Sequence, residues 1–240
     1  MNKELAQYIV EMAQEAPKTV EVGGRTYLAN RGGLKEIKDG RVSALRTNTI
    51  DSIVQYIKIP TGPAPEEWIV HVQSHNTVVL TTHPTGVDME RDVFMIAEAN
   101  APGFPTDKFL ESETFMISAM ARLYESAGKR LLLDFVGDIQ DIEEQRVRDN
   151  GTGQTITAKS GIASVADKEV PNPVELAPFR TFCDVSQPIS PFILRVRKGP
   201  EVGIFEADGG AWKTDAIRII ADHIRTALSD YTDRPVHIIA

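Results

Sequence analysis

The sequence lacks the features on which several classes of protein depend. It contains one cysteine, Cys183, so neither an intramolecular disulfide nor a cysteine-based zinc site can form. Within the run FRTFCDV we interpret Cys183 as a small buried apolar residue of a strand, not as a nucleophile. No apolar run approaches the roughly 18 residues that a membrane-spanning helix needs, so we expect no membrane partner.

Recognisable catalytic and cofactor motifs are also missing. The chain has no GxxxxGK[ST] phosphate loop, no GxGxxG dinucleotide fingerprint, and no GxSxG, HExxH or CxxC signature. We therefore predict no catalytic residue, no cofactor and no metal site, and we interpret the protein as a non-enzymatic one. The first segment spaces Leu5, Ile9 and Met12 as an amphipathic helix does, which is not the pattern of a signal peptide.

The composition that remains is that of an ordinary globular protein. Of its 240 residues, 42% are hydrophobic, which is enough to build one large core or two small ones. Charged residues make up 25%, close to the average for folded domains. The formal net charge of -8 repels phosphate backbones, so we expect no general nucleic-acid binding, although a local basic patch could override it.

The hydrophobic pattern changes period along the chain in an irregular order. We expect helices over 2–16, 50–57, 108–125, 129–148 and 212–228, and strands over 68–74, 77–82, 92–99, 154–159, 174–183, 191–198 and 202–207. Residues 19–28 are expected to form a hairpin whose two-residue turn is Gly23-Gly24. This order predicts an α+β fold with a mixed, mainly antiparallel sheet, packed helices, and a C-terminal β-meander followed by a helix. Residues 1–150 would form an N-terminal α+β half and 151–240 the meander and its helix, either as two domains or as one continuous domain.

The histidines are the first candidate ligands. Three of the five lie in one expected hairpin, whose turn falls at 75–76. That register places His83 opposite Trp68, and leaves it roughly three sheet positions from His71, which is too far for a shared metal ion. His237 lies in a polar tail and has no partner that the sequence identifies.

An acidic stripe is the second candidate. Asp134, Asp138 and Asp141 fall on one face of the helix expected over 129–148. Adjacent carboxylates can bind Mg²⁺ or act in acid–base catalysis. The same spacing is produced by a solvated face opposite the apolar one, which is our preferred interpretation.

A basic strand is the strongest candidate. Arg195 and Arg197 alternate with apolar residues and should project from one face of the meander, where Arg180 of the neighbouring strand can join them. Clustered guanidinium groups suit phosphates, which would make these residues an anion-binding site. The alternative is an exposed face with salt bridges to nearby glutamates such as Glu206.

The turn Gly209-Gly210 before the last helix could extend this site. Glycines permit close approach of the backbone, and free N–H groups at a helix start can hold an anion, while Trp212 could stack on a base. The alternative is a tight turn with Trp212 packed beneath it.

Five separated segments together resemble one family. They are TNTIDSIVQYIK, RLLLDFVGDI, VRDNGTGQTITAKSGIASV, VPNPVELAPFRTF and FEADGGAWKTDAIR, and their order and spacing resemble the YfdQ-like phage and prophage proteins over residues 20–230. The resemblance implies a phage-encoded protein that works in the bacterial host cytoplasm. It implies no reaction, cofactor or catalytic residue.

Three functions fit these observations. The first, which we favour, is a phage accessory protein that acts by homo-oligomerisation and binding, for example in counter-defence by capturing a host immune protein or a signalling nucleotide on the arginines and Trp212. The second is a factor for phage recombination or replication that binds single-stranded DNA. The third is a metal-dependent hydrolase that uses the aspartate stripe, with Asp138 at its centre.

Overall fold

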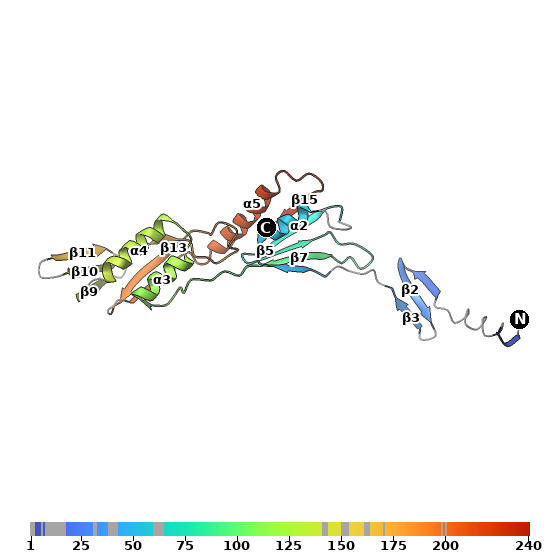
Figure 1. The fold of residues 1–240 in the computed structure, drawn as a ribbon, viewed down its shortest axis with the longest axis horizontal. Coiled ribbons are helices and arrows are strands. Elements are labelled where there is room, and N and C mark those ends of the chain that lie inside the picture. Colours follow the sequence, from blue (N-terminus) through green and yellow to red (C-terminus); the bar gives the residue numbers. More distant parts are fainter. Residues whose placement is uncertain are drawn as a thin grey trace.

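The computed structural model describes residues 3–5, 7, 18–30, 33–37, 43–59, 65–140, 144–149, 154–160, 164–169, 171–197, 199 and 201–240. Within these residues the fold is α+β, as predicted, and its strands form four sheets. Figure 1 shows an elongated molecule. The sheet nearest the N-terminus lies at one end, a five-stranded sheet lies in the middle, and two further sheets lie at the other end.

The middle unit is a five-stranded sheet covered on one face by two helices. The sheet order is β15-β5-β6-β7-β4, with β4 at Leu45–Thr47, β5 at Trp68–Ser74, β6 at Thr77–Thr81, β7 at Val93–Glu98 and β15 at Val236–Ile239. The helices are α2 (Ile50–Lys58) and α5 (Trp212–Ala227). Helix α2 buries Ile50, Ile53, Val54 and Ile57, the helical spacing that predicted it. These side chains pack on Trp68, Val70 and Leu80 in one hydrophobic core.

A second unit repeats this two-layer arrangement. Its sheet has the order β12-β13-β14-β8, with β8 at Leu110–Glu111, β12 at Val174–Leu176, β13 at Ser190–Arg197 and β14 at Glu201–Glu206. Helices α3 (Ser112–Arg122) and α4 (Ala127–Gln140) cover one face of it. Phe115 and Leu132 from the helices meet Phe192 and Leu194 from β13 in a separate core.

The two cores divide the chain differently from the boundary expected near residue 150. The second core combines α3 and α4, which precede that residue, with β12–β14, which follow it. The first core combines α2 and β5–β7 with α5 and with Phe182 and Val185. Each core therefore needs residues from both sides of position 150, because strands and helices distant in sequence supply its two layers.

Two small sheets lie outside these cores. The first consists of β1 (Lys18–Val22), β2 (Arg25–Asn30) and β3 (Gly33–Glu36), and the second of β9 (Glu144–Asp149), β10 (Gln154–Ser160) and β11 (Ser164–Glu169). Gly23 and Gly24 have φ of 60° and 78°, which confirms the predicted two-residue turn between β1 and β2.

Several expected elements were wrong. The helix over 129–148 ends at Gln140, and Glu144–Asp149 pairs with β10 as strand β9. The strand over 174–183 ends at Leu176, and Cys183 is exposed in a turn, not buried in a strand. Buried Phe182 and Val185 lie three positions apart, which is the spacing of a turn and not of a strand. The helix expected over 2–16 lies almost wholly outside the described residues.

The segment interpreted as a polar tail contains strand β15. It pairs in parallel with β5, with Val236 opposite Trp68 and Ile239 opposite His71. Four residues are too short a run for periodicity to identify, and their partner lies far away in the sequence. Among the described residues, no helix combines the length and apolar character needed to cross a membrane.

Helix α4 offers a matched test of the second unit. A Cβ on Gly128 would lie 1.7 Å from the carbonyl oxygen of Glu175, so Gly128→Ala must push the helix away from β12. We expect it to lower the free energy of unfolding by about 3 kcal/mol, the upper part of the overpacking range. Gly137→Ala, in the same helix, meets only Met116 Cε at 3.9 Å and should stabilise the protein by up to about 1 kcal/mol. Denaturant unfolding monitored by circular dichroism measures both, and equal effects would contradict this packing.

Candidate functional site

Arg195 and Arg197 project from the same face of β13, opposite to the face that builds the core. Buried Phe192, Leu194 and Val196 alternate with them along the strand. This outer face is partly covered, because the guanidinium of Arg197 lies 3.7 Å from the ring centre of Phe109. Arg197 is exposed beyond that ring, whereas Arg195 is half-buried.

Arg180 does not join these two arginines. It lies in the segment after β12, and its guanidinium contacts Ser190, Glu206 and the ring of Phe192. Phe192 pairs with Glu206 across β13 and β14, so both side chains share the inner face of the sheet. The expected three-arginine site is thus divided between two faces of one sheet.

The side chain of Arg180 is already engaged by protein groups. It is only 9% exposed and lies 3.3 Å from the Glu206 carboxylate. Its Nη2 donates to the carbonyl of Pro188 and to Ser190 Oγ, and its plane lies 4.2 Å from the ring centre of Trp212. Burial lowers the pKa of Arg180, and the nearby carboxylates, chiefly that of Glu206, act in the opposite direction. Such a guanidinium has its main interactions inside the protein and offers little to a ligand.

Backbone N–H groups in the turn before α5 and at the start of the helix are also bound by a protein group. Gly209 and Gly210 have φ of 62° and 85°, so the turn needs glycine. The carboxylate of Asp208 accepts the backbone N–H groups of Gly210 at 2.9 Å and Trp212 at 3.0 Å. Asp208 therefore satisfies the start of the helix with its own negative charge, which an incoming anion would have to displace.

His75 completes this cluster at the tip of the β5–β6 hairpin. Its ring meets the ring of Trp212 edge-on, with ring centres 4.9 Å apart, and its carbonyl accepts a hydrogen bond from Thr181 Oγ1. Burial, and then the positive charges of Lys213 and Arg180, lower the pKa of His75. The residues around Trp212 thus join the two cores at their contact.

The aspartate stripe is only partly described. Asp134 and Asp138 are exposed on α4, while Asp141 lies outside the described residues. Buried Phe135 and Val136 face the core on the other side of the helix. This burial pattern is that of a solvated helix face.

A cluster that the sequence did not predict lies at one end of the five-stranded sheet. Glu67 precedes β5, His83 follows β6, and His237 belongs to β15. Oε1 of Glu67 lies 3.3 Å from Nε2 of His83, and its Oε2 lies 2.9 Å from Nε2 of His237. The ligand atoms of the three residues all lie within 4.8 Å of one another. Two imidazoles and a carboxylate are a donor set that transition metals bind.

The register of the sheet explains this convergence. Ile69 of β5 pairs with Thr81 of β6 and with His237 of β15. Continuing the antiparallel ladder by two residues brings Glu67 opposite His83, on the face that carries His237. Three neighbouring strands thus deliver one donor each.

The register predicted for the β5–β6 hairpin differs from the observed one by one residue, and for this reason the cluster was not predicted. The turn lies at 75–76, as expected, but the ladder shifts between Val72 and Ser74. A bulge adds one residue to a strand, and a one-residue shift moves every later side chain to the other face. His83 therefore faces Glu67 instead of Trp68, and the expectation that His237 has no partner was wrong.

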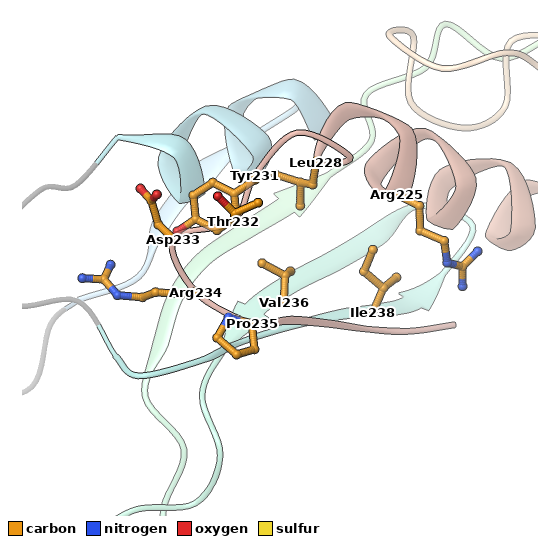
Figure 2. Close-up of a pocket in the computed structure, with 9 residues that line it drawn as sticks. All are labelled: Arg225, Leu228, Tyr231, Thr232, Asp233, Arg234, Pro235, Val236 and Ile238. Atoms are coloured by element: carbon orange, nitrogen blue, oxygen red, sulfur yellow. The ribbon is translucent and has the colours of Figure 1, made fainter.

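Two hollows border this sheet. One of about 390 Å³ lies beside the cluster and is lined by Glu67, His83, Thr85, Asp92 and Phe94, among others. The other, of about 540 Å³, lies between the end of α5 and β15. Figure 2 shows its apolar side chains around the space, with Arg225 at one end and Arg234 at the other. Both volumes lie in the range of small-molecule sites.

The capping role of Asp208 can be measured directly. Asp208→Ala leaves the N–H groups of Gly210, in the turn, and of Trp212, the first residue of α5, without their acceptor. It should lower the free energy of unfolding by about 1 kcal/mol. Asp222→Ala is a matched control in the same helix, because it removes only the exposed pair with Arg225. Its expected cost is about 0.3 kcal/mol. Equal losses in the two variants, measured by denaturant unfolding, would show that Asp208 is not a cap.

The environment of His75 predicts the direction of a pH effect. Because the pKa of His75 is lower in the folded protein, the unfolded chain binds a proton at this histidine more readily than the folded protein does. The contribution of His75 to the free energy of unfolding should be fully present above pH about 6.5, the ordinary histidine pKa. It should decrease as the pH falls toward the lowered pKa. An NMR titration of the ring should give a midpoint below 6.5, and Lys213→Gln should raise it. A wild-type midpoint at or above that value contradicts the arrangement.

Comparisons with known proteins add no further constraint. No family model, curated protein or solved structure matches the chain. The resemblance to the YfdQ-like proteins therefore stays a prediction, and the functional argument depends on the geometry above.

Proposed function

We propose that the protein acts by self-association and binding, through an assembly held together by the β1–β3 sheet. One observation carries this proposal: the sheet presents an apolar face that neither core covers. No residue of β1–β3 belongs to either of the two hydrophobic cores formed by the described residues. Figure 1 shows the sheet lying apart from both units.

The pairing of the strands defines this apolar face. Val20 lies opposite Tyr27, and Ala29 lies opposite Leu34, so these side chains and Val22 point to one side. Arg25 and Glu36 lie on the same side and form a salt bridge, so this face is largely but not wholly apolar. The exposed fractions are 40% for Val20, 55% for Val22 and 61% for Leu34. The other side carries the polar residues Thr19, Glu21, Thr26 and Lys35, together with Leu28.

Such a sheet needs a second layer. A small sheet with one apolar face is stable when that face packs on another element, and alone it is marginal. Within the described chain the sheet touches the remainder at its turn, where Arg25 pairs with Asp88 and Gly24 approaches Val87. Val87 and Met89 are themselves exposed, and they extend the apolar surface toward the β6–β7 connection.

A second copy of the chain is the occupant that fits this face. Two identical amphipathic sheets packed face to face form a sandwich, and a two-fold contact uses the same patch twice. Among the described residues, β1 and β3 are the edge strands of this sheet, and another copy can extend them. Assembly would bury the exposed valines and Leu34 and would remove these edges from solvent.

The binding partner of the assembly is a separate question. Capture of a signalling nucleotide on the arginines receives little support, because Arg180 and Trp212 stack on each other and Arg195 lies on the opposite face. Capture of a protein, as expected for a phage counter-defence factor, agrees better with exposed apolar surface. Exposed Ile117 and Met120 on α3, with Tyr124 just after the helix, offer such a surface at the other end of the molecule.

The oligomeric state tests the assembly. Size-exclusion chromatography with light scattering should give a mass that is a multiple of the monomer mass at micromolar concentration. Val20→Lys places a charge at the centre of the proposed interface and should raise the concentration at which the assembly dissociates by at least about tenfold, equivalent to about 1.4 kcal/mol.

The neighbouring position supplies a matched control. Thr19→Lys adds the same charge to the same strand but to the polar face, and should leave the mass unchanged. Circular dichroism should show both variants to be folded. A wild-type monomer, or equal dissociation of the two variants, would overturn self-association through this face.

A further inference from the structure

We propose that Glu67, His83 and His237 form a site for a divalent transition-metal ion, with Zn²⁺ as the fitting probe. The proposal is independent of self-association, because these residues lie on the five-stranded sheet and not on β1–β3. It rests on the geometry of three donors that converge from three strands.

The separations of the donor atoms fit a metal ion. Zinc binds imidazole nitrogen and carboxylate oxygen at about 2.0–2.2 Å, so two ligand atoms of a tetrahedral site lie about 3.3–3.5 Å apart. Glu67 Oε1 and His83 Nε2 are already 3.3 Å apart, and Glu67 Oε2 lies 2.9 Å from His237 Nε2. The largest separation within the set is no more than 4.8 Å, which small side-chain rotations can close.

The donor types select the class of ion. Hard cations such as Mg²⁺ and Ca²⁺ prefer sites made wholly of oxygen ligands, whereas two imidazoles favour transition metals. Three protein ligands leave at least one coordination position for water or another ligand. The histidine side chains are 52% exposed and that of Glu67 is 39% exposed, so this position is accessible to solvent and to the adjoining hollow of about 390 Å³.

Binding of a metal ion would also stabilise the edge of the five-stranded sheet. Glu67 extends β5, His83 extends β6, and His237 lies in β15, the short strand that pairs in parallel at the sheet edge. One ion held by all three would connect this edge strand to its neighbour β5 and to β6 beyond it. Metal binding should therefore protect the backbone of β15, because a ligand that binds only the folded arrangement stabilises it.

An ion pair is the competing explanation for the same geometry. Glu67 can accept hydrogen bonds from both rings without any metal. The two explanations differ in their response to added metal, since an ion pair alone gives no stoichiometric binding of Zn²⁺.

Calorimetric titration of Zn²⁺ distinguishes them. The full chain, freed of any affinity tag and treated with a chelator, should bind one Zn²⁺ per subunit at this cluster, and Mg²⁺ should not compete. His83→Ala, His237→Ala and the nearly isosteric Glu67→Gln should each weaken Zn²⁺ binding by about 100-fold. Mutation of residues that only hydrogen-bond a metal ligand already weakens binding by up to about 100-fold, and loss of a ligand itself should cost at least as much. Circular dichroism confirms that each variant remains folded.

His71→Ala is the matched control. His71 is exposed on β5 and shares the sheet face of Ile69, but it lies outside the cluster, so Zn²⁺ affinity should be unchanged. Hydrogen exchange supplies a second measurement: Zn²⁺ should slow exchange at 236–239 in the wild type and in His71→Ala, and not in His83→Ala. Absence of Zn²⁺ binding, or equal weakening by His71→Ala, overturns the proposal.

Discussion

A buried cation lies where the two units of this molecule meet. Arg180 lies between Glu206 at the end of β14, Ser190 at the start of β13 and the indole of Trp212 at the start of α5. Burying a charge is costly, and it is tolerated here because a carboxylate, two oxygen acceptors and an aromatic face surround the guanidinium. Since these groups come from both units, this arginine contributes to the contact between the two cores.

That arrangement also decides which surfaces remain for function. Several polar groups around Trp212 have partners where the units meet: Asp208 accepts the first N–H of α5, and His75 and Arg180 pack on the indole. An anion at this place would have to displace contacts on which the fold depends. The groups still available lie elsewhere, as apolar side chains on β1–β3 and as paired histidines at the end of the five-stranded sheet.

The sequence was a reliable guide where structure is local and a poor one where it is not. The Gly23-Gly24 turn and the buried face of α2 follow from backbone freedom and helical spacing, and both were confirmed. Strand β15 could not be recognised, because its stability comes from pairing with β5, 168 residues earlier in the chain. The bulge after Val72 was equally hidden, and it alone moved His83 to the face of Glu67.

Edge strands connect the two proposals. In the five-stranded sheet both edges, β15 and β4, are short and pair in parallel with their neighbours, which limits their use as templates for another chain. A metal ion on His237 would secure the β15 edge further, since it would connect that strand to β5 and β6. Among the described residues, two of the three strands of the β1–β3 sheet are edges, and Val20, Val22 and Leu34 on its largely apolar side are exposed. The two sheets thus differ within the described residues: helices α2 and α5 cover one face of the central sheet, whereas the largely apolar side of β1–β3 is exposed. Assembly through β1–β3 would use this difference.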